Sequence, residues 1–466
     1  MSRPPLDLVV TGGTVVNADW SGPASVLVSE GRITGLLAPG EAVPGAARVI
    51  DATGGFVVPG GVDPHCHISM EMGGSTTRDG YREATLAALA GGTTTVVDFA
   101  IPAPGQAPVD AVAQRREMAA DARCDTALHA CVVERDATTD DQLRGLVADG
   151  VVTVKLFTTY RDQVMANADT VHAVLKVLRD SGGMAYVHAE ANPIIEHAQA
   201  IQAGCGHIGA ADHALTRPEI AETAAVAAVL AAAESLHAPV YFVHQSTGEA
   251  IDLTRAARRR GVHAYTETCP HYLTLDESRY RGPHPERFVC CPPLRTKSTV
   301  EQVRRRASHG AVDTVGSDHC CYDTTQKTAA ADDVRRVPNG MPGVQTRLPV
   351  VWTTLVHERG VPPERFVALT STNAARLNGL AGRKGVIAPG ADADLVVLDP
   401  AQLRIVRAGD LAMATDYTPY EGTALAGWPL TVVATGRVVV DGGVLTDPGP
   451  VGRALRSDPL PRQFLT

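Results

Sequence analysis

The sequence lacks the features that mark secreted, membrane-spanning or nucleic-acid-binding proteins. Its nine cysteines include no C-x-x-C spacing, and the adjacent pairs Cys290-Cys291 and Cys320-Cys321 do not resemble a disulfide framework. No stretch approaches eighteen apolar residues, and the first ten residues contain no continuous apolar segment, so we expect neither a membrane span nor a signal peptide. These absences favour a cytoplasmic protein.

Positive charge is also scarce. The net charge is −9, which provides no basic surface for nucleic acid or for an anionic membrane. Lysine is especially rare, with five residues against thirty-seven arginines. One of the five, Lys155, lies inside the apolar run 151–157, where a buried ammonium needs a partner or a changed charge state. Arginine would serve equally well at a solvated strand end, so this position indicates a role that requires lysine.

The composition and length indicate a globular protein with one large and one smaller domain. Hydrophobic residues make up 44% of the 466 residues and charged residues 20%, as in ordinary soluble proteins. Short β-like segments occupy both ends of the chain, and VVTGGTVV at 9–16 is echoed by VVATGRVV at 432–439, both typical of hairpins. We therefore predict that residues 1–56 and 386–466 pair into one β-sandwich domain, with residues 57–385 forming the other domain.

The middle of the chain alternates between strand-like and helical patterns. Eight apolar runs predict strands: Phe56–Asp63, Thr94–Phe99, Thr126–Val132, Val151–Phe157, Met184–His188, Val240–His244, Val262–Thr266 and Val312–Gly316. Helical patterns fill the gaps, among them Arg82–Ala90, Val109–Ala120, Asp169–Arg179, Pro218–Leu236 and Gly248–Arg260. This order predicts a (β/α)₈ TIM barrel whose active site lies at the C-terminal ends of the strands. A doubly wound sheet is the structural alternative.

Candidate metal ligands gather at the predicted strand ends. His65 and His67 close the first strand two residues apart, so both side chains point the same way, although such a pair alone is as consistent with a polar strand end as with a metal site. The other ligand-type side chains at this edge are Lys155, His188, His244 and Asp318. Four imidazoles and a carboxylate suit zinc or a similar divalent ion, and they exceed what one open catalytic site requires. The set therefore favours two metals, which can hold a hydroxide between them.

Short motifs recur along nearly the whole chain. They are GGVDPHCH at 60–67, GGTTT at 91–95, Lys155-Leu156-Phe157 with Tyr160, VHAE at 187–190, LTRP at 215–218, ETCPHYL at 267–273, PPLR at 292–295, GSDH at 316–319, PNG at 338–340 and GADADLVVLDP at 390–400. Together they are highly specific, and through them the chain strongly resembles the dihydropyrimidinase and hydantoinase branch of the cyclic amidohydrolases.

The resemblance implies a binuclear centre bridged by a carbamylated lysine. Lys155 would be the N6-carboxylysine, a modification that needs a neutral amine and that arginine cannot undergo. His65 and His67 would bind the more buried ion, and His188 and His244 the more exposed one. Asp318 would act both as a ligand and as the general base.

The resemblance also implies the substrate contacts. Tyr160 would stabilise the oxyanion formed when the ring amide of a cyclic ureide opens to an N-carbamoyl amino acid. The main chains of Cys291 and Asn339 would bind the ring, although many relatives have serine in place of Cys291. A hydrophobic pocket for the exocyclic substituent would be formed by Met70, Met72 and Phe157.

Two alternatives remain open at this point. Allantoinases share the TCPHYL motif, and non-catalytic scaffolds with the same fold exist. A scaffold would have lost ligands, whereas all six are present here. Ser69 stands where dihydroorotases carry an arginine for the substrate carboxylate, which argues against that activity. HAEANP at 188–193 replaces the usual HAENG, so the loop after His188 is expected to differ from that of the family.

The resemblance also implies the oligomeric state, which would be a homotetramer or a homodimer.

Overall fold

A closed parallel barrel forms the centre of the molecule in the computed structural model, which describes residues 6–72 and 74–461, leaving out the Met72 side chain. Its strands are β8 (Gly61–His67), β11 (Thr93–Ala100), β12 (Asp125–Cys131), β13 (Thr153–Phe157), β14 (Met184–His188), β15 (Val240–Phe242), β16 (Ala264–Thr268), β17 (Thr314–Val315) and β18 (His319–Cys320). The eighth position is divided, because β17 pairs with β16 while β18 pairs with β8 and closes the ring. The predicted (β/α)₈ barrel is confirmed, and the open doubly wound sheet is excluded.

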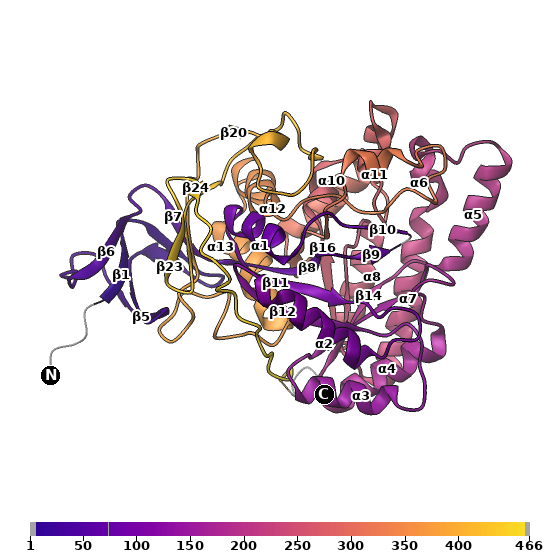
Figure 1. The fold of residues 1–466 in the computed structure, drawn as a ribbon, viewed down its shortest axis with the longest axis horizontal. Helices are drawn as coiled ribbons and strands as arrows, with labels where there is room; N and C mark the ends of the chain where they lie inside the picture. The colour runs from indigo at the N-terminus through magenta and orange to yellow at the C-terminus, as the bar shows by residue number, and fades with distance from the viewer. Residues whose placement is uncertain (1–5, 73, 462–466) are drawn as a thin grey trace.

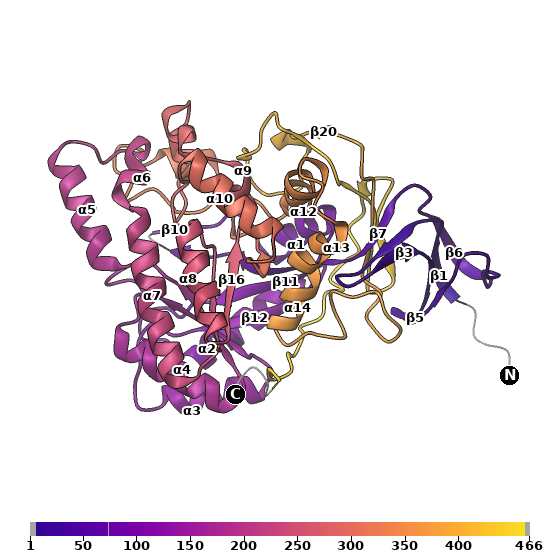
Figure 2. The same cartoon turned by 180° about the vertical axis from the view of Figure 1, so that it is seen from behind.

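Helices surround the barrel (Figures 1 and 2). They are α1 (Tyr81–Ala90), α2 (Pro108–Met118), α3 (Thr139–Ala148), α4 (Ala168–Ser181), α5 (Asn192–Gly204), α6 (His213–Thr216), α7 (Glu219–Leu236), α8 (Gly248–Arg259), α9 (Pro270–Thr274), α10 (Lys297–Ser308), α11 (Thr324–Thr328), α12 (Arg347–Val351), α13 (Pro363–Val367) and α14 (Asn373–Leu377). Pro218 is the N-cap of α7, one position before the helix rather than in its first turn. Among the described residues, no helix is both long and apolar enough to cross a membrane.

The two ends of the chain share one sheet beside the barrel, as predicted. This sheet has the strand order β24 (Val444–Leu445), β23 (Arg437–Asp441), β22 (Pro429–Ala434), β19 (Leu395–Leu398), β7 (Phe56–Pro59), β2 (Thr14–Val16) and β3 (Ser21–Pro23). A second sheet packs against it, with the order β5 (Arg32–Leu37), β4 (Ser25–Ser29), β1 (Leu6–Thr11) and β6 (Ala46–Asp51). Aliphatic side chains from both sheets form the core between them. Figure 1 shows the first and last strands, indigo and yellow, on the same side of the molecule.

Two strand predictions were wrong. In both places the chain passes from one sheet to another at a glycine. Residues 9–16 are not a hairpin, because β1 and β2 lie in different sheets and Gly12 turns the corner with a φ of 78°. The echoing segment 432–439 does form one, between β22 and β23. The predicted strand 56–63 is two strands, since β7 belongs to the sandwich and β8 to the barrel. They separate at Gly60, where a Cβ atom would lie 2.1 Å from the Thr94 Oγ1.

The C-terminal tail, residues 452–460, crosses the N-terminal ends of the barrel strands. Its backbone amides donate hydrogen bonds to the carbonyls of Ala122, Thr126, Gly150 and Gly182.

All nine cysteines are free thiols, in agreement with the expected absence of a disulfide framework.

One buried lysine links the barrel to the sandwich. Lys384 is about 1% exposed and donates to Asp125 at the start of β12, at 2.6 Å, and to Asp394 just before β19. Asp392 lies 3.2 Å from the same Nζ, and the tail residue Arg453 also pairs with Asp125 and Asp392. This single ammonium thus lies within reach of three carboxylates.

We predict that Lys384→Met lowers the free energy of unfolding by about 3–5 kcal/mol, because removing one member of a buried ion cluster leaves carboxylates without compensation. Urea denaturation measures the loss. The control is Lys176→Met, which removes an exposed i,i+4 pair with Asp180 and should cost no more than about 0.5 kcal/mol. Equal losses in the two variants would contradict the assigned role of Lys384.

Candidate metal centre

The six predicted ligands converge at the C-terminal end of the barrel. His65 and His67 end β8, Lys155 is the middle residue of β13, and His188 is the last residue of β14. His244 follows β15 by two residues, and Asp318 occupies the break between β17 and β18. All six side chains are buried. Residues far apart in the sequence thus meet in one small volume.

Three of these side chains already have the spacing of ligands around one ion. The Nε2 atoms of His65 and His67 are 3.2 Å apart, and the Oδ1 of Asp318 lies 3.1 Å from the first and 3.3 Å from the second. Ligands placed about 2.0–2.1 Å from a tetrahedral zinc stand about 3.3 Å from one another. The trio therefore fits a divalent cation without rearrangement.

A buried carboxylate fixes the orientation of this trio. The Nδ1 of His65 donates to the Oε1 of Glu267 at 2.6 Å, which leaves its Nε2 lone pair for an ion. The same carboxylate accepts from the backbone amide of His244 at 3.0 Å and from the hydroxyl of Tyr241 at 2.8 Å. Glu267 therefore holds the ring of His65 and the backbone of His244 in place. The sequence analysis assigned Glu267 no role, although it is the first residue of the ETCPHYL motif.

His188 and His244 form the second group. Their ring centroids are 4.4 Å apart in an edge-to-face arrangement, and the His244 ring is 5.4 Å from that of His65. The Nε2 of His188 donates to Glu190 at 2.7 Å, which leaves Nδ1 as the nitrogen that could bind an ion. Burial, only partly opposed by Glu190, lowers the pKa of His188 to about 4 and keeps the imidazole neutral, as a metal ligand must be. Glu190 was missed as well, although its spacing of two residues from His188 could have indicated it.

Lys155 joins the two groups. It is fully buried, and its Nζ has no hydrogen-bond partner among the described residues. The rings of Phe99 and Phe157 lie 4.7 and 4.8 Å from this nitrogen. Burial lowers the pKa of Lys155 to about 8, which favours a neutral and therefore nucleophilic amine. An unpartnered amine beside two sets of ligands fits a group that becomes an anionic bridge between two ions.

The predicted substrate-binding residues line the same cavity. Its walls include five of the six predicted ligands and also Met70, Phe157, Tyr160, Cys291 and Asn339. His65 is not among the residues that line this cavity, and the side chain of Met72 lies outside the described residues. Tyr160, His244 and Asp318 all have left-handed backbones, with φ values of 66°, 40° and 49°. Such strain is found at functional sites more often than elsewhere.

A second buried lysine connects the two segments expected to bind the ring. The Nζ of Lys327 donates to the carbonyls of Val289, at 2.8 Å, and Pro338, at 2.6 Å. The thiol of Cys291 donates to the Oδ1 of Asn339 at 3.1 Å and joins the segments a second time. Sequence reasoning missed Lys327, although the scarcity of lysine was a signal that could have found it.

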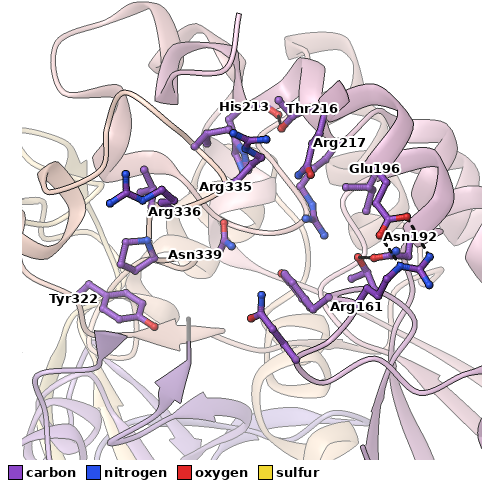
Figure 3. A pocket seen from close by; sticks show the side chains of 18 residues that line it. Arg161, Asn192, Glu196, His213, Thr216, Arg217, Tyr322, Arg335, Arg336 and Asn339 are labelled. Atoms are coloured by element: carbon purple, nitrogen blue, oxygen red, sulfur yellow. Dashed lines mark hydrogen bonds and ion pairs between the residues drawn. The ribbon is translucent and has the colours of Figure 1, made fainter. Parts of the chain in front are cut away.

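A second cavity, drawn in Figure 3, adjoins the first and shares Tyr160 and Asn339 with it. Its walls carry the arginines Arg161, Arg217, Arg335 and Arg336, and Arg161 forms two hydrogen bonds with Glu196. Four arginine side chains thus gather in the cavity next to the predicted ligands.

Another buried group of potential ligands does not fit a metal. Asp79, His319 and Cys321 lie close together. The Nε2 of His319 donates to Asp79 at 2.8 Å, while its Nδ1 accepts the backbone amide of Gly343 at 3.0 Å. Both ring nitrogens are already used, so this histidine has a structural role.

Comparison with known proteins identifies relatives along the whole chain. The sequence matches the Amidohydrolase family over residues 56–439. It is 35% identical to a dihydropyrimidinase from Rattus norvegicus, covering 97% of this chain and 89% of the relative, and 35% identical to a D-hydantoinase from Geobacillus stearothermophilus, covering 93% and 92%. The crystal structure of a dihydropyrimidinase from Brevibacillus agri superposes with a TM-score of 0.94 at 32% identity, over 97% of this chain and 99% of that one. A D-hydantoinase from Thermus sp. gives a TM-score of 0.93 at 32% identity, with the same coverage.

We predict that Glu267→Gln weakens the affinity for divalent metal by about 10–100-fold, because the orientation of His65 and His244 depends on this carboxylate. Metal content after dialysis against graded chelator, measured by inductively coupled plasma mass spectrometry, gives the affinity. Glu222→Gln is the control, since Glu222 is an equally buried carboxylate that hydrogen-bonds Ser246 and Thr247 and none of the six predicted ligands. The same metal loss in both variants would refute the specific role of Glu267.

Proposed function

The chain belongs to the amidohydrolase family, in its dihydropyrimidinase and hydantoinase branch, and we propose that it hydrolyses the ring amide of a cyclic ureide. The substrate is a 5,6-dihydropyrimidine or a 5-substituted hydantoin, and the product is an N-carbamoyl amino acid. The observation that carries this proposal is the convergence of a buried ligand set, an unpartnered lysine and Tyr160 on one cavity.

The residues suit two divalent ions, and the imidazole-rich set favours zinc. His65, His67 and Asp318 would hold one ion, and His188 and His244 the other. Lys155, carbamylated to N6-carboxylysine, would bridge them. When bound, such ions supply a nucleophilic hydroxide at neutral pH and polarise the carbonyl that it attacks.

The protein's own groups position the ring and move the proton. Asp318 would accept the proton of the nucleophile and return it to the leaving ring nitrogen. Asp318 is buried beside both imidazoles, with its Oδ1 3.1 Å from the Nε2 of His65 and 3.3 Å from that of His67. The Tyr160 hydroxyl would donate to the developing oxyanion.

The ring would be held by main-chain groups of Cys291 and Asn339, two residues whose segments Lys327 fixes relative to each other. Met70 and Phe157 would pack on the exocyclic substituent, with Met72 as a third member of that pocket. The proposal also includes a homotetramer, as the family resemblance implies, and a cytoplasmic location, which the nine free thiols favour.

We expect the purified protein to open dihydrouracil or hydantoin and to contain up to two divalent metals per chain. Ring opening is followed by the loss of ureide absorbance, and metal content by mass spectrometry, with allantoin assayed in parallel. Metal-loaded protein that is inert on both ureides yet active on allantoin would refute the proposed substrate and support an allantoinase.

We predict that Lys155→Ala abolishes ring opening and loosens metal binding, and that Lys155→Arg does the same because a guanidinium cannot be carbamylated. Carbon NMR after incubation with ¹³C-bicarbonate should show a carbamate signal in the unsubstituted protein and in neither variant. Lys297→Ala, at an exposed position on α10, is the matched control. Full activity of Lys155→Arg would exclude the carbamate bridge.

A further inference from the structure

Arg217, in the LTRP motif, is a buried cation in the wall of the second cavity. It lies between α6 and Pro218, and its side chain is 5% exposed. Figure 3 shows the side chain descending from this wall toward the interior of the cavity. The proposed chemistry assigns Arg217 no role, although its contacts lead to two residues that are central to that chemistry.

The first contact leads to a metal ligand. The Nε of Arg217 donates to both carboxylate oxygens of Glu190 at 3.2 Å, and its Nη2 donates to Oε2 as well. That Oε2 also accepts from the Nε2 of His188 at 2.7 Å. Because a carboxylate oxygen can only accept, this hydrogen bond keeps the proton of His188 on Nε2 and leaves Nδ1 free to bind an ion.

The second contact leads to the tyrosine. The central carbon of the Arg217 guanidinium lies 5.1 Å from the centroid of the Tyr160 ring, within the range of a cation–π interaction. The Tyr160 ring in turn meets the His188 ring edge to face, with 5.3 Å between centroids. Tyr160 has a left-handed backbone, with a φ of 66°, so its conformation needs support from surrounding contacts.

A planar guanidinium suits both contacts. It binds the Glu190 carboxylate through Nε and Nη2, while its central carbon lies over the Tyr160 ring. A lysine would keep the positive charge, but it presents a compact ammonium that lacks the flat face and the paired donors. The geometry therefore distinguishes the shape of arginine from its charge.

We propose that Arg217 is a positioning residue that holds His188 and Tyr160 in a fixed relation to each other. Through Glu190 it sets the ligand atom of His188, and through the ring face it sets the place of the Tyr160 hydroxyl. One side chain thus aligns a metal ligand with the group that donates to the oxyanion. The part of this inference that concerns Tyr160 rests on the proposed ring-opening function. The part that concerns His188 rests on metal binding alone.

The test compares Arg217→Lys with Arg258→Lys. Arg258 is a matched control because it also binds a carboxylate through two contacts, to Asp313 at 2.9 and 3.0 Å, and lies 5.4 Å from the centroid of the Tyr265 ring. That pair sits at the opposite ends of the strands, away from the predicted ligands. We expect Arg217→Lys to lower kcat for hydantoin at least about 10-fold with less than about 3-fold change in KM, and Arg258→Lys to leave both near the unsubstituted values.

Metal content gives a readout that does not depend on activity. After mild chelation, Arg217→Lys should retain about one metal per chain where Arg258→Lys and the unsubstituted protein retain about two. Glu190→Gln breaks the link to His188 from the other side and should match Arg217→Lys in metal loss. It therefore decides the question if Arg217→Lys fails to fold.

Combining the substitution with Tyr160→Phe tests the route through the tyrosine. If Arg217 acts through Tyr160, the decrease in kcat caused by Arg217→Lys should be smaller in the Tyr160→Phe background than in the unsubstituted protein. Fully multiplicative effects, unchanged metal content in both Arg217→Lys and Glu190→Gln, or an equal decrease in kcat in Arg258→Lys would each overturn the proposal. If the unsubstituted protein opens neither ureide, the proposed function fails, while the metal measurements still decide the link between Arg217 and His188.

Discussion

The end of the barrel that carries the predicted ligands is organised around one fully buried carboxylate, that of Glu267, whose charge must be compensated. Glu267 on β16 accepts hydrogen bonds from the imidazole of His65, the backbone of His244 and the hydroxyl of Tyr241. A buried carboxylate without such donors would be costly, so the three groups must be in place when the barrel closes. These hydrogen bonds fix the positions of β8, β15 and β16 along the strand direction relative to one another. The alignment that satisfies Glu267 is also the alignment that brings the predicted ligands within reach of one another.

The order of strands and the predicted ligands could be inferred from the sequence because both leave local signals. Apolar runs mark the strands, and side chains two residues apart share a face, as His65 and His67 do. Glu267 carries no comparable signal, since its partner His65 is 202 residues away and only the folded chain brings them together. The two-residue spacing of Glu190 from His188 was a local signal that could have indicated it. The false hairpin at 9–16 has a similar cause. A Gly-Gly pair can reverse a strand or pass it to another sheet, and only the folded structure shows that here it does the second.

Lysine usage in this chain follows the same physical logic. Three of the five lysines, Lys155, Lys327 and Lys384, are buried, in a protein that otherwise uses arginine for positive charge. Lys327 and Lys384 each place a compact ammonium between several oxygen atoms, and Lys155 supplies an amine that can lose its proton. A guanidinium is larger, planar and always charged, so it suits none of these positions. Arg217 is the opposite case, since its flat shape is what its two contacts require.

The path of the chain also constrains when the fold can be completed during synthesis. The sheet beside the barrel joins β2 and β7, near the start of the chain, to β19 and β22, which follow more than 330 residues later. The tail at 452–460 then covers the strand ends opposite the ligands. Because β19 and β22 are synthesised more than 330 residues after β7, the early strands must wait with unpaired edges until these partners leave the ribosome. The waiting edges are where a nascent chain of this protein is most exposed to aggregation.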